Sequence, residues 1–267
     1  MEYAIIAVTV VIGSGLTFFS GFGLGTLLLP VFSLFFDPAV AVGATAIVHL
    51  ANNLFKFALV SKYIHLPTLL RFGIPAIGFA FLGSYLLTKL SASGALYAYE
   101  IGGSAYEVTS MNLVIGILMI IFAWIDLSPK FNSLNIPAKY QPLGGSLSGF
   151  FGGISGHQGA FRAAFLAKAG LNKEQFVGTS NAISLCVDLT RIPVYLGLIQ
   201  IGSKKALDLR EALSEGSMLL VVGISAAFIG AVVGKQLIRK TTIAGVQKLV
   251  GVLLFAMGAL IISGLIS

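Results

Sequence analysis

The sequence has little charge and almost no cysteine. Only 10% of its 267 residues are Asp, Glu, Lys or Arg, and 57% are hydrophobic, whereas a soluble globular chain is about a quarter charged. Cys186 is the single cysteine, which excludes an intrachain disulfide, a CxxC redox motif and a thiolate metal cluster. The N-terminus has no basic segment and no cleavage-site pattern, so we expect no signal peptide.

Motifs of enzymes and metal sites are missing as well. The chain contains no HExxH, GxSxG or P-loop pattern, and His49, His65 and His157 lack the spacing of metal ligands. We therefore expect no enzymatic activity, no metal and no cofactor. The formal charge of +7 comes from Lys and Arg that lie mostly in short loops between apolar runs. Such residues orient membrane helices, so we expect no nucleic-acid partner.

Long apolar runs dominate the chain. Several are about 20 residues long, which is enough to cross a hydrocarbon core of about 30 Å. The runs are continuous, whereas strands of a membrane barrel would be about 10 residues long and alternating. The sequence therefore predicts an all-α integral membrane protein.

The chain divides into two related halves. VGATAIVHLANNLFKF (42–57) aligns with VGTSNAISLCVDLTRI (177–192). Each half begins with an apolar element broken by glycines, SGFGLG at 20–25 and GGISGHQG at 152–159, and three helices follow it. We expect a first transmembrane repeat at 1–128, a proline-containing linker at 129–143 and a second transmembrane repeat at 144–267. Such duplicated halves are common in transporters.

Three helices are expected in each half after the broken element. Their predicted ranges are 39–61, 69–90 and 112–126 in the first half, and 175–198, 215–237 and 242 to the C-terminus in the second. We expect 91–110 to be an external loop and 203–214 to be a loop or a short surface helix.

The broken elements either cross the membrane fully or turn back as re-entrant hairpins. Without Lys56, Arg162 and Arg191, which lie inside helices, fourteen of the seventeen Lys and Arg residues remain. If the broken elements cross fully, seven of these residues lie on each side of the membrane. If the elements turn back, ten lie on one side and four on the other. Only the second division gives a positive-inside bias, so we favour hairpins, inverted repeats and external termini. The length of residues 3–19, about 25 Å of helix, argues for full crossing.

Polar side chains inside the apolar segments are the candidate site. One helical face of the first repeat carries Thr45, His49, Asn53 and Lys56, and its counterpart carries Ser180, Ser184, Asp188 and Arg191. Facing lipid would be costly for both stripes, so we expect them to face each other or a wet cavity.

The second break adds the other candidates. His157 and Gln158 lie at the break, and Arg162 follows one turn later. A new helix start exposes backbone N–H groups, and an arginine fork suits sulfonate, sulfite or carboxylate oxygens. The predicted substrate-binding residues are Arg162, Arg191, His157, Gln158, Asn53, Ser180, Gly25 and Gly159. The predicted proton-coupling or charge-partner residues are Asp188, His49 and Lys56.

Each candidate also has a structural explanation. Asp188 and Arg191 are three residues apart and can simply neutralise each other, and Lys56 can extend to the membrane interface. Arg162 can bind lipid phosphate, His157 can be a packing residue, and Asn53 can join helices as a hydrogen-bonding residue.

The motifs resemble a known family. GFGLGTLLLP followed by PAVAVGATA is similar to the first repeat of the TauE/SafE sulfite exporters, also called toluene sulfonate uptake permeases. GGISGHQGAFRAAFL followed by FVGTSNAISLCVDLTR resembles the second repeat, in a variant in which GHQG replaces the usual glycine cluster. The resemblance implies a multi-pass carrier of the prokaryotic inner membrane for sulfite, sulfoacetate or other sulfonates. It also implies backbone roles for Gly21, Gly23, Gly25 and Pro30, and for Gly153, Gly156 and Gly159.

The functional expectation is a secondary transporter that binds a small sulfur-containing anion at the membrane midplane. The alternatives are a passive anion channel, a carboxylate transporter and a non-transporting membrane subunit. The expected partners are the small anion, membrane lipid and a second copy of the chain in a homodimer.

Overall fold

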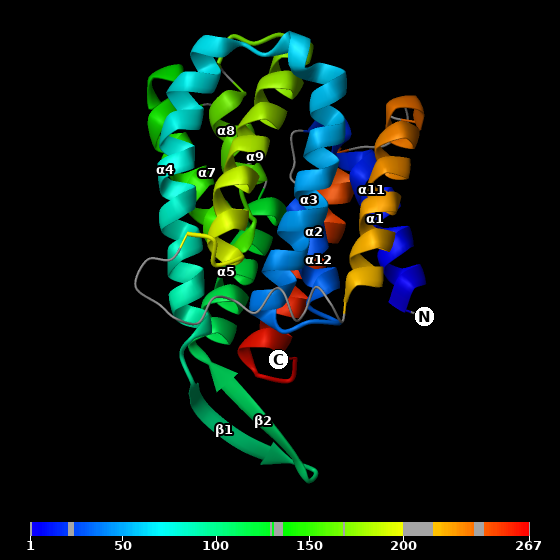
Figure 1. The fold of residues 1–267 in the computed structure, drawn as a ribbon, viewed down its shortest axis with the longest axis vertical. Helices are drawn as coiled ribbons and strands as arrows, with labels where there is room; N and C mark the ends of the chain where they lie inside the picture. The colour runs from blue at the N-terminus through cyan, green and yellow to red at the C-terminus, as the bar shows by residue number, and fades with distance from the viewer. Residues whose placement is uncertain are drawn as a thin grey trace.

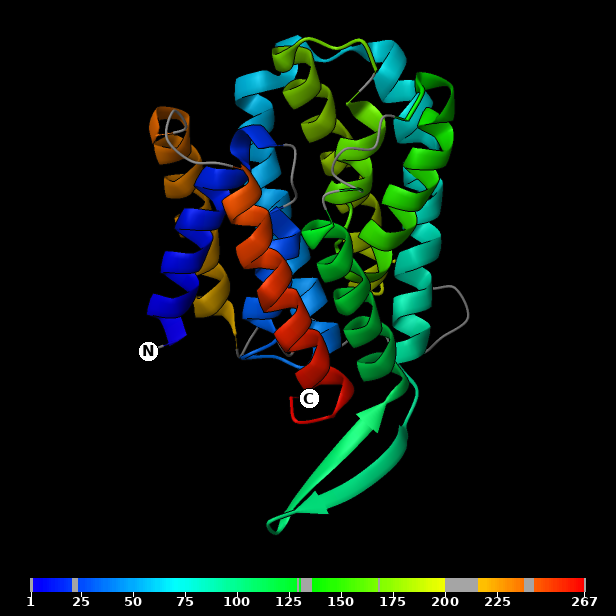
Figure 2. The same ribbon diagram turned by 180° about the vertical axis from the view of Figure 1, so that it is seen from behind.

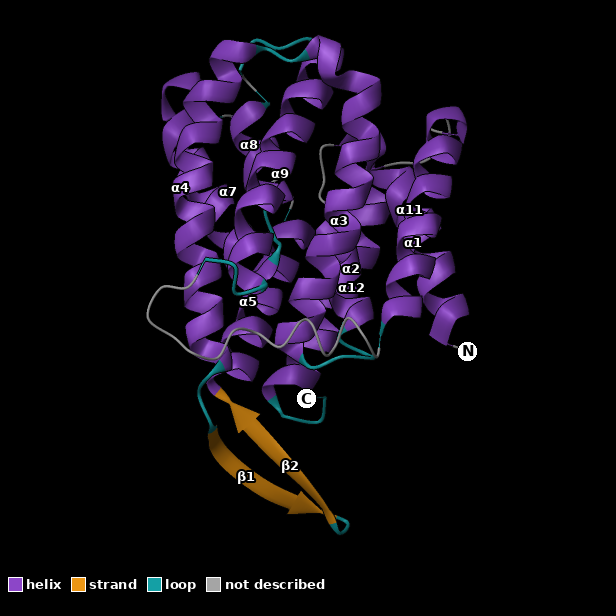
Figure 3. Ribbon diagram, viewed as in Figure 1, coloured by secondary structure: helices purple, strands orange, loops and turns teal. Residues whose placement is uncertain are grey.

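A computed structural model describes residues 2–20, 24–128, 130, 136–167, 169–199, 216–237 and 243–266. Its helices stand side by side in one bundle, and a two-stranded β-hairpin projects from one end (Figures 1 and 3). We call this the hairpin end. The opposite end carries the short 3-10 turn η1 (Ser61–Tyr63) and is called the η1 end. The chain begins and ends near the hairpin end (Figure 1).

The helices of the first half follow the predicted apolar runs closely. They are α1 (Glu2–Ser20), α2 (Leu24–Phe32), α3 (Pro38–Val60), α4 (Leu66–Ser91) and α5 (Ser110–Leu127). Pro38 lies in the first turn of α3, where a missing N–H leaves no helical hydrogen bond unmade. Thr109 caps α5 by accepting a hydrogen bond from the backbone N–H of Asn112 at 3.1 Å.

The second half repeats this order of elements. Its helices are α7 (Gln141–Ser155), α8 (Gly159–Leu166), α9 (Lys173–Tyr195), α11 (Ser217–Leu237) and α12 (Ile243–Ile262); a 3-10 turn, η2 (Ala138–Tyr140), precedes α7. Gly156 ends α7 with φ +81°, a left-handed conformation that glycine adopts without a Cβ penalty. The surface helix predicted at 203–214 lies outside the described residues.

The segment 91–110, which we expected to be a loop, contains the β-hairpin. Strands β1 (Ala95–Ile101) and β2 (Ser104–Thr109) pair antiparallel. Gly102 and Gly103 form the connection with φ +62° and +84°, as a tight two-residue hairpin turn requires. The prediction of a loop was therefore wrong for this segment, because we judged it by its polarity and overlooked the Gly-Gly turn between alternating residues.

Three described helical segments are long and apolar enough to cross a membrane, namely Pro38–Tyr63, Leu66–Ser91 and Ser110–Leu127. Shorter apolar helices, Glu2–Thr17, Ser217–Val233 and Val250–Ile262, accompany them. Helix α9 is not among the candidate spans, and it carries the charged residues Asp188 and Arg191 within its length. The architecture is thus a helical membrane protein with one projecting hairpin.

Glycines set the closest helix contacts. An ideal Cβ on Gly145 or Gly149 of α7 would lie 2.1 Å from the carbonyl oxygen of Phe72 or Ala76 of α4, respectively. The order of these contacts makes α4 and α7 parallel, both running from the η1 end toward the hairpin end. Small residues allow backbones in membrane helices to approach this closely.

Both short helices lie back against the helix before them. In the second half, a Cβ on Gly144 would lie 2.6 Å from the Cβ of Phe165, so α8 returns along α7. In the first half, a Cβ on Gly13 of α1 would lie 2.9 Å from Leu27 Cδ1 of α2. In Figure 2, which shows the molecule from behind, α1 and α12 lie nearer the viewer than α3.

The buried apolar side chains form two clusters. The smaller contains Phe72, Ala76, Ala80, Phe165, Leu166, Ile183 and Val187, from α4, α8 and α9. The larger draws mainly on α1, α2, α3, α5, α11 and α12. Of the polar residues that we singled out in the sequence, His49, Asn53 and Asp188 lie where α3 meets α9.

Candidate functional site

The ends of the two broken elements meet inside the bundle. A Cβ on Gly25, in the first turn of α2, would lie 3.2 Å from the carbonyl oxygen of Gly156, which follows α7. The same Cβ would lie 3.7 Å from His49 Cδ2 on α3. A side chain at position 25 would be tight here, so the start of α2 and the end of α7, far apart in the sequence, form one region beside α3.

Asp188 is the centre of a buried hydrogen-bond network between α3 and α9. Its Oδ2 lies 2.7 Å from His49 Nδ1 and accepts a hydrogen bond from Asn53 Nδ2 at 2.7 Å. Its Oδ1 accepts a hydrogen bond from Arg191 Nε at 3.0 Å. Asp188 is fully buried, and a buried carboxylate is tolerated only when partners satisfy it in this way. The network joins the two halves of the chain.

Arg191 links this network to the second break. Its Nη2 lies 2.8 Å from Asp188 Oδ1, and its Nη1 donates to the carbonyl oxygen of Gly152 at 2.9 Å. A Cβ on Gly156 would lie 3.2 Å from the same Nη1. The side chain has no solvent exposure, so it points into the bundle and occupies the region where α7 ends.

Arg162 lies on the opposite side of the second break, on α8. Its Nε donates to Ser180 Oγ at 2.7 Å, and its Nη1 donates to Gln158 Oε1 at 3.0 Å. The Gln158 carbonyl oxygen in turn accepts a hydrogen bond from Ser148 Oγ at 2.8 Å. Arg162 is 3% exposed, which places its positive charge inside the bundle.

His157 packs against an aromatic ring from the first half. Its imidazole stacks on Phe122 of α5 with centroids 4.6 Å apart and an interplanar angle of 14°. Its Nδ1 lies 3.1 Å from Ser155 Oγ. The histidine is 1% exposed, so the packing role that we considered from the sequence is present, and Nε2 is left for another partner.

Several buried polar atoms in this region have no hydrogen-bond partner among the described residues. They are Thr45 Oγ1, His157 Nε2, Gln158 Nε2 and Asn181 Oδ1. Buried polar groups are normally satisfied by protein or by an ordered small molecule. The Thr45 hydroxyl and the Gln158 amide nitrogen can donate to an oxyanion, so the region has unused donors next to two arginines.

The remaining predicted residues line the same region. Asn53 Oδ1 accepts a hydrogen bond from Asn181 Nδ2 at 3.2 Å. Lys56, on the same helix, is only 7% exposed, so its side chain lies within the bundle rather than extended to the outer surface. Gly159 is the buried first residue of α8.

Sequence reasoning missed some of the contacting groups. Tyr195 is fully buried and donates a hydrogen bond from its hydroxyl to the carbonyl oxygen of Gly153. Phe122 stacks on His157, and the Gly152 carbonyl oxygen accepts a hydrogen bond from Arg191. Both contacts join residues far apart in the chain, so the local sequence gave no signal for them. The polarity of Asn181 within an apolar helix was visible, but its pairing with Asn53 was not.

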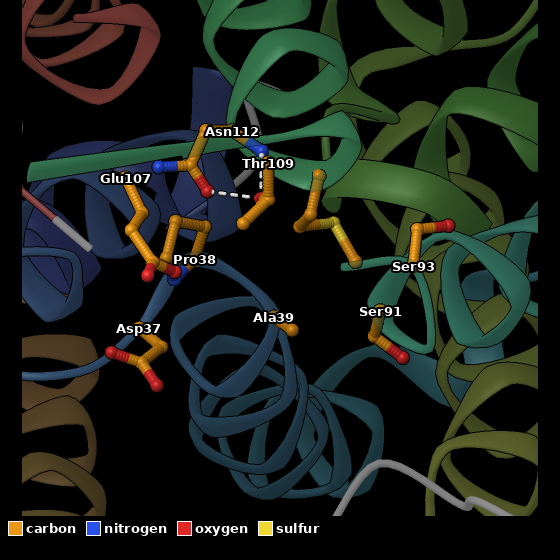
Figure 4. Close-up of a pocket in the computed structure, with 9 residues that line it drawn as sticks. Asp37, Pro38, Ala39, Ser91, Ser93, Glu107, Thr109 and Asn112 are labelled. Atoms are coloured by element: carbon orange, nitrogen blue, oxygen red, sulfur yellow. Dashed lines mark hydrogen bonds between the residues drawn. The ribbon is translucent and has the colours of Figure 1, made fainter. Parts of the chain in front are cut away.

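A separate pocket lies at the hairpin end. Its volume is about 310 Å³, and its lining comprises Asp37, Pro38, Ala39, Ser91, Ser93, Glu107, Thr109, Met111 and Asn112. Figure 4 shows the Asp37 and Glu107 carboxylates on one side of this pocket and the Ser91 and Ser93 hydroxyls on the other. None of the predicted site residues lines it.

Comparison with known proteins gives one result that covers nearly the whole chain. No curated protein matches the sequence. The protein-family comparison matches residues 5–261 to the family described as sulfite exporter TauE/SafE, a span that includes both chain breaks and the Asp188 network. The chain therefore belongs to the TauE/SafE sulfite exporter family.

Proposed function

We propose that this protein is a secondary transporter of a small sulfur-containing anion, with sulfite, sulfoacetate and other organosulfonates as the candidate substrates. The observation that carries the proposal is the burial of Arg162 and Arg191 beside the place where the two chain breaks meet. Buried charges in membrane proteins mark substrate and ion pathways, and family membership gives the sulfur-anion class.

The two halves act as inverted repeats, each with a re-entrant hairpin. The support is directional: α4 leads from the η1 end to the hairpin end, whereas its counterpart α11 leads the other way (Figures 1 and 2). The return of α8 along α7, marked by Gly144 against Phe165, supports a hairpin over a full crossing. Hairpin tips that meet near the midplane are a common site design in secondary transporters.

The η1 end faces the cytoplasm, and the protein lies in the prokaryotic inner membrane. Lys62 in η1, Arg71 near the start of α4, Lys139 in η2 and Lys173 at the start of α9 all lie toward the η1 end. Lys89 lies in the last turn of α4 at the hairpin end. This distribution fits the positive-inside rule and supports an external hairpin.

The anion binds between Arg162 and the tip of the second hairpin. Arginine offers a planar fork for two oxygens, and the Nε2 atoms of His157 and Gln158 have no hydrogen-bond partner among the described residues. Asp188 holds Arg191 in place when the site is empty, and the buried His49–Asp188 contact gives a route for a coupling proton. The Thr45 hydroxyl completes the donors on the α3 side.

Flux into proteoliposomes tests the proposal. The purified protein should carry radiolabelled sulfite at a rate that saturates with concentration and depends on the proton gradient. Arg162→Ala should lower flux by about 10- to 100-fold, since a hydrogen bond to a charged group contributes about 1.5–3 kcal/mol. Leu189→Ala, on the exposed face of α9, is the matched control and should transport normally.

Three results would contradict the proposal in different ways. Full activity of an Arg162→Ala, Arg191→Ala double variant would contradict the proposed anion site. A linear, gradient-independent flux would indicate a passive channel. Equal competition by acetate and by sulfonates would indicate a carboxylate carrier.

A further inference from the structure

The tightest helix contacts join opposite halves of the chain. Helix α4 of the first half packs most extensively against α7 of the second, and α1 of the first half packs against α11 of the second. A Cβ on Gly153 of α7 would lie 2.2 Å from the Ala80 carbonyl oxygen of α4, and a Cβ on Gly230 of α11 would lie 2.3 Å from the Val11 carbonyl oxygen of α1. Backbones this close leave no room for sliding.

Each of these pairs has further helices attached. The smaller hydrophobic core fastens α8 and α9 to α4 through Phe165 and Ile183, which pack with Phe72. On the other side, Ser14 of α1 lies 2.7 Å from the Ala227 carbonyl oxygen of α11 and 2.9 Å from Asn52 Oδ1 of α3. Two groups result, α4–α7–α8–α9 and α1–α2–α3–α11, and Figure 1 shows the first toward the left of the bundle and the second toward the right.

The seam between the two groups runs between α3 on one side and α9 and α4 on the other. Its middle contains the polar network of His49, Asn53 and Asp188, whose side-chain hydrogen bonds link the two sides. Polar contacts of this kind can exchange partners with water or an anion, whereas three successive glycines of α7, Gly145, Gly149 and Gly153, hold it against the backbone of α4.

The two ends of the seam differ. At the η1 end, a Cβ on Gly178 of α9 would lie 2.8 Å from the Val60 carbonyl oxygen, where α3 ends, so the helices touch. At the hairpin end, the pocket of about 310 Å³ lies between Ala39 of α3 on one side and Ser91 of α4 on the other (Figure 4). The two groups are therefore in contact at the η1 end and leave a pocket between them at the hairpin end.

We infer that the bodies that move during transport are not the two sequence repeats but the composite groups α4–α7–α8–α9 and α1–α2–α3–α11, each built from helices of both halves. Rotation of one group against the other closes the pocket at the hairpin end and separates Gly178 from the end of α3. Each group contains one whole broken element, so the site lies between the two groups. Their rotation opens the site first toward one side of the membrane and then toward the other. This inference rests on the proposed transport function.

Four lipid-facing side chains allow a direct test. Val8 of α1, Leu82 of α4, Leu189 of α9 and Val221 of α11 are 58%, 49%, 53% and 55% exposed, respectively. Each is changed to cysteine in pairs, in a Cys186→Ser background, and spin-labelled in proteoliposomes. Distances are measured by pulsed electron resonance with and without a saturating gradient of sulfite.

The composite groups and the sequence repeats predict opposite outcomes. Val8–Val221 and Leu82–Leu189 join different repeats within one group, so their distances should stay constant. Val8–Leu82 and Leu189–Val221 join different groups within one repeat, so their distances should change. A rotation of about 15°, a familiar size for rigid-body switches, acting over half of a core of about 30 Å, moves a label by about 4 Å.

Sulfite flux through the same labelled proteins distinguishes failure of the proposed transport function from failure of the inference about the moving groups. Absence of flux in every pair and in the Cys186→Ser parent would reject the proposed transport function. Flux combined with constant distances in the second set and changing distances in the first would show that the repeats move as units and would overturn the inference. Flux with no distance change in any pair would overturn it as well.

Discussion

Replacing Asp188 by asparagine isolates the energy of the buried charge pair. Asparagine keeps the size of the side chain and removes its charge, while Arg191 stays fully buried and keeps its hydrogen bond to the Gly152 carbonyl oxygen. Removing one member of a buried ion pair costs about 3–5 kcal/mol, because the other charge is left uncompensated. We therefore expect Asp188→Asn to lower the free energy of unfolding by about 3–5 kcal/mol.

A double-mutant cycle separates this loss from other effects. Arg191→Gln leaves the Asp188 carboxylate without its cation and should cost a similar amount. The double variant removes both charges, and replacing a whole buried pair by neutral groups is often close to neutral. Its loss should therefore be smaller than the sum of the single losses by several kcal/mol, whereas residues that do not interact are additive to within about 0.5 kcal/mol.

Unfolding in mixed detergent micelles, followed by circular dichroism, measures the four free energies. Leu189→Ala, one residue along α9 but 53% exposed, is a control for substitution in this helix and should change stability little. Additive losses in the cycle, or an Asp188→Asn variant as stable as the parent, would refute the view that the carboxylate compensates Arg191.

The remaining predictions concern packing, ligand binding and capping. Gly149→Ala should lose about 1–3 kcal/mol of stability by overpacking, since its Cβ would lie 2.1 Å from the Ala76 carbonyl oxygen; Gly78→Ala, with no atom within 4 Å, should gain about 0.5–1 kcal/mol, and thermal denaturation compares the two. Thr45→Val removes a buried hydroxyl that has no described partner, so it should keep stability and weaken sulfite binding by about 2- to 10-fold, as measured by calorimetry; unchanged affinity would exclude this hydroxyl from the site. Asn172→Ala breaks the capping box of α9 and should cost about 0.5–2 kcal/mol with normal flux; a loss of flux without a loss of stability would contradict a purely structural role.

The membrane helices could be predicted from the sequence because lipid imposes a simple rule. A spanning segment must be apolar for about 20 residues, and this fixed α3 and α4 to within a few residues. The same rule made polar residues inside those segments conspicuous, which led to Asp188 and His49. Their direct contact follows from the duplication only if the two stripes face each other, and in the structure they do.

Contacts between distant backbone groups could not be predicted. The Gly152 carbonyl that binds Arg191, and the ring of Phe122 that covers His157, depend on how α5 and α7 pack. No periodicity in either segment encodes that packing. The β-hairpin was predictable in principle from Gly102 and Gly103, but two isolated strands are marginal in water and polarity alone suggested a loop.

The hairpin offers a practical advantage that the rest of the molecule lacks. Tyr99 donates a hydrogen bond to the Ser263 carbonyl oxygen, and a Cβ on Gly264 would meet the Glu107 carbonyl oxygen at 2.6 Å, so β1 and β2 are attached to the end of α12. An antibody fragment raised against the loop at Gly102 would stand outside any detergent belt as an alignment mark for electron microscopy. Its binding to intact cells, compared with permeabilised ones, would report which face of the membrane the hairpin occupies.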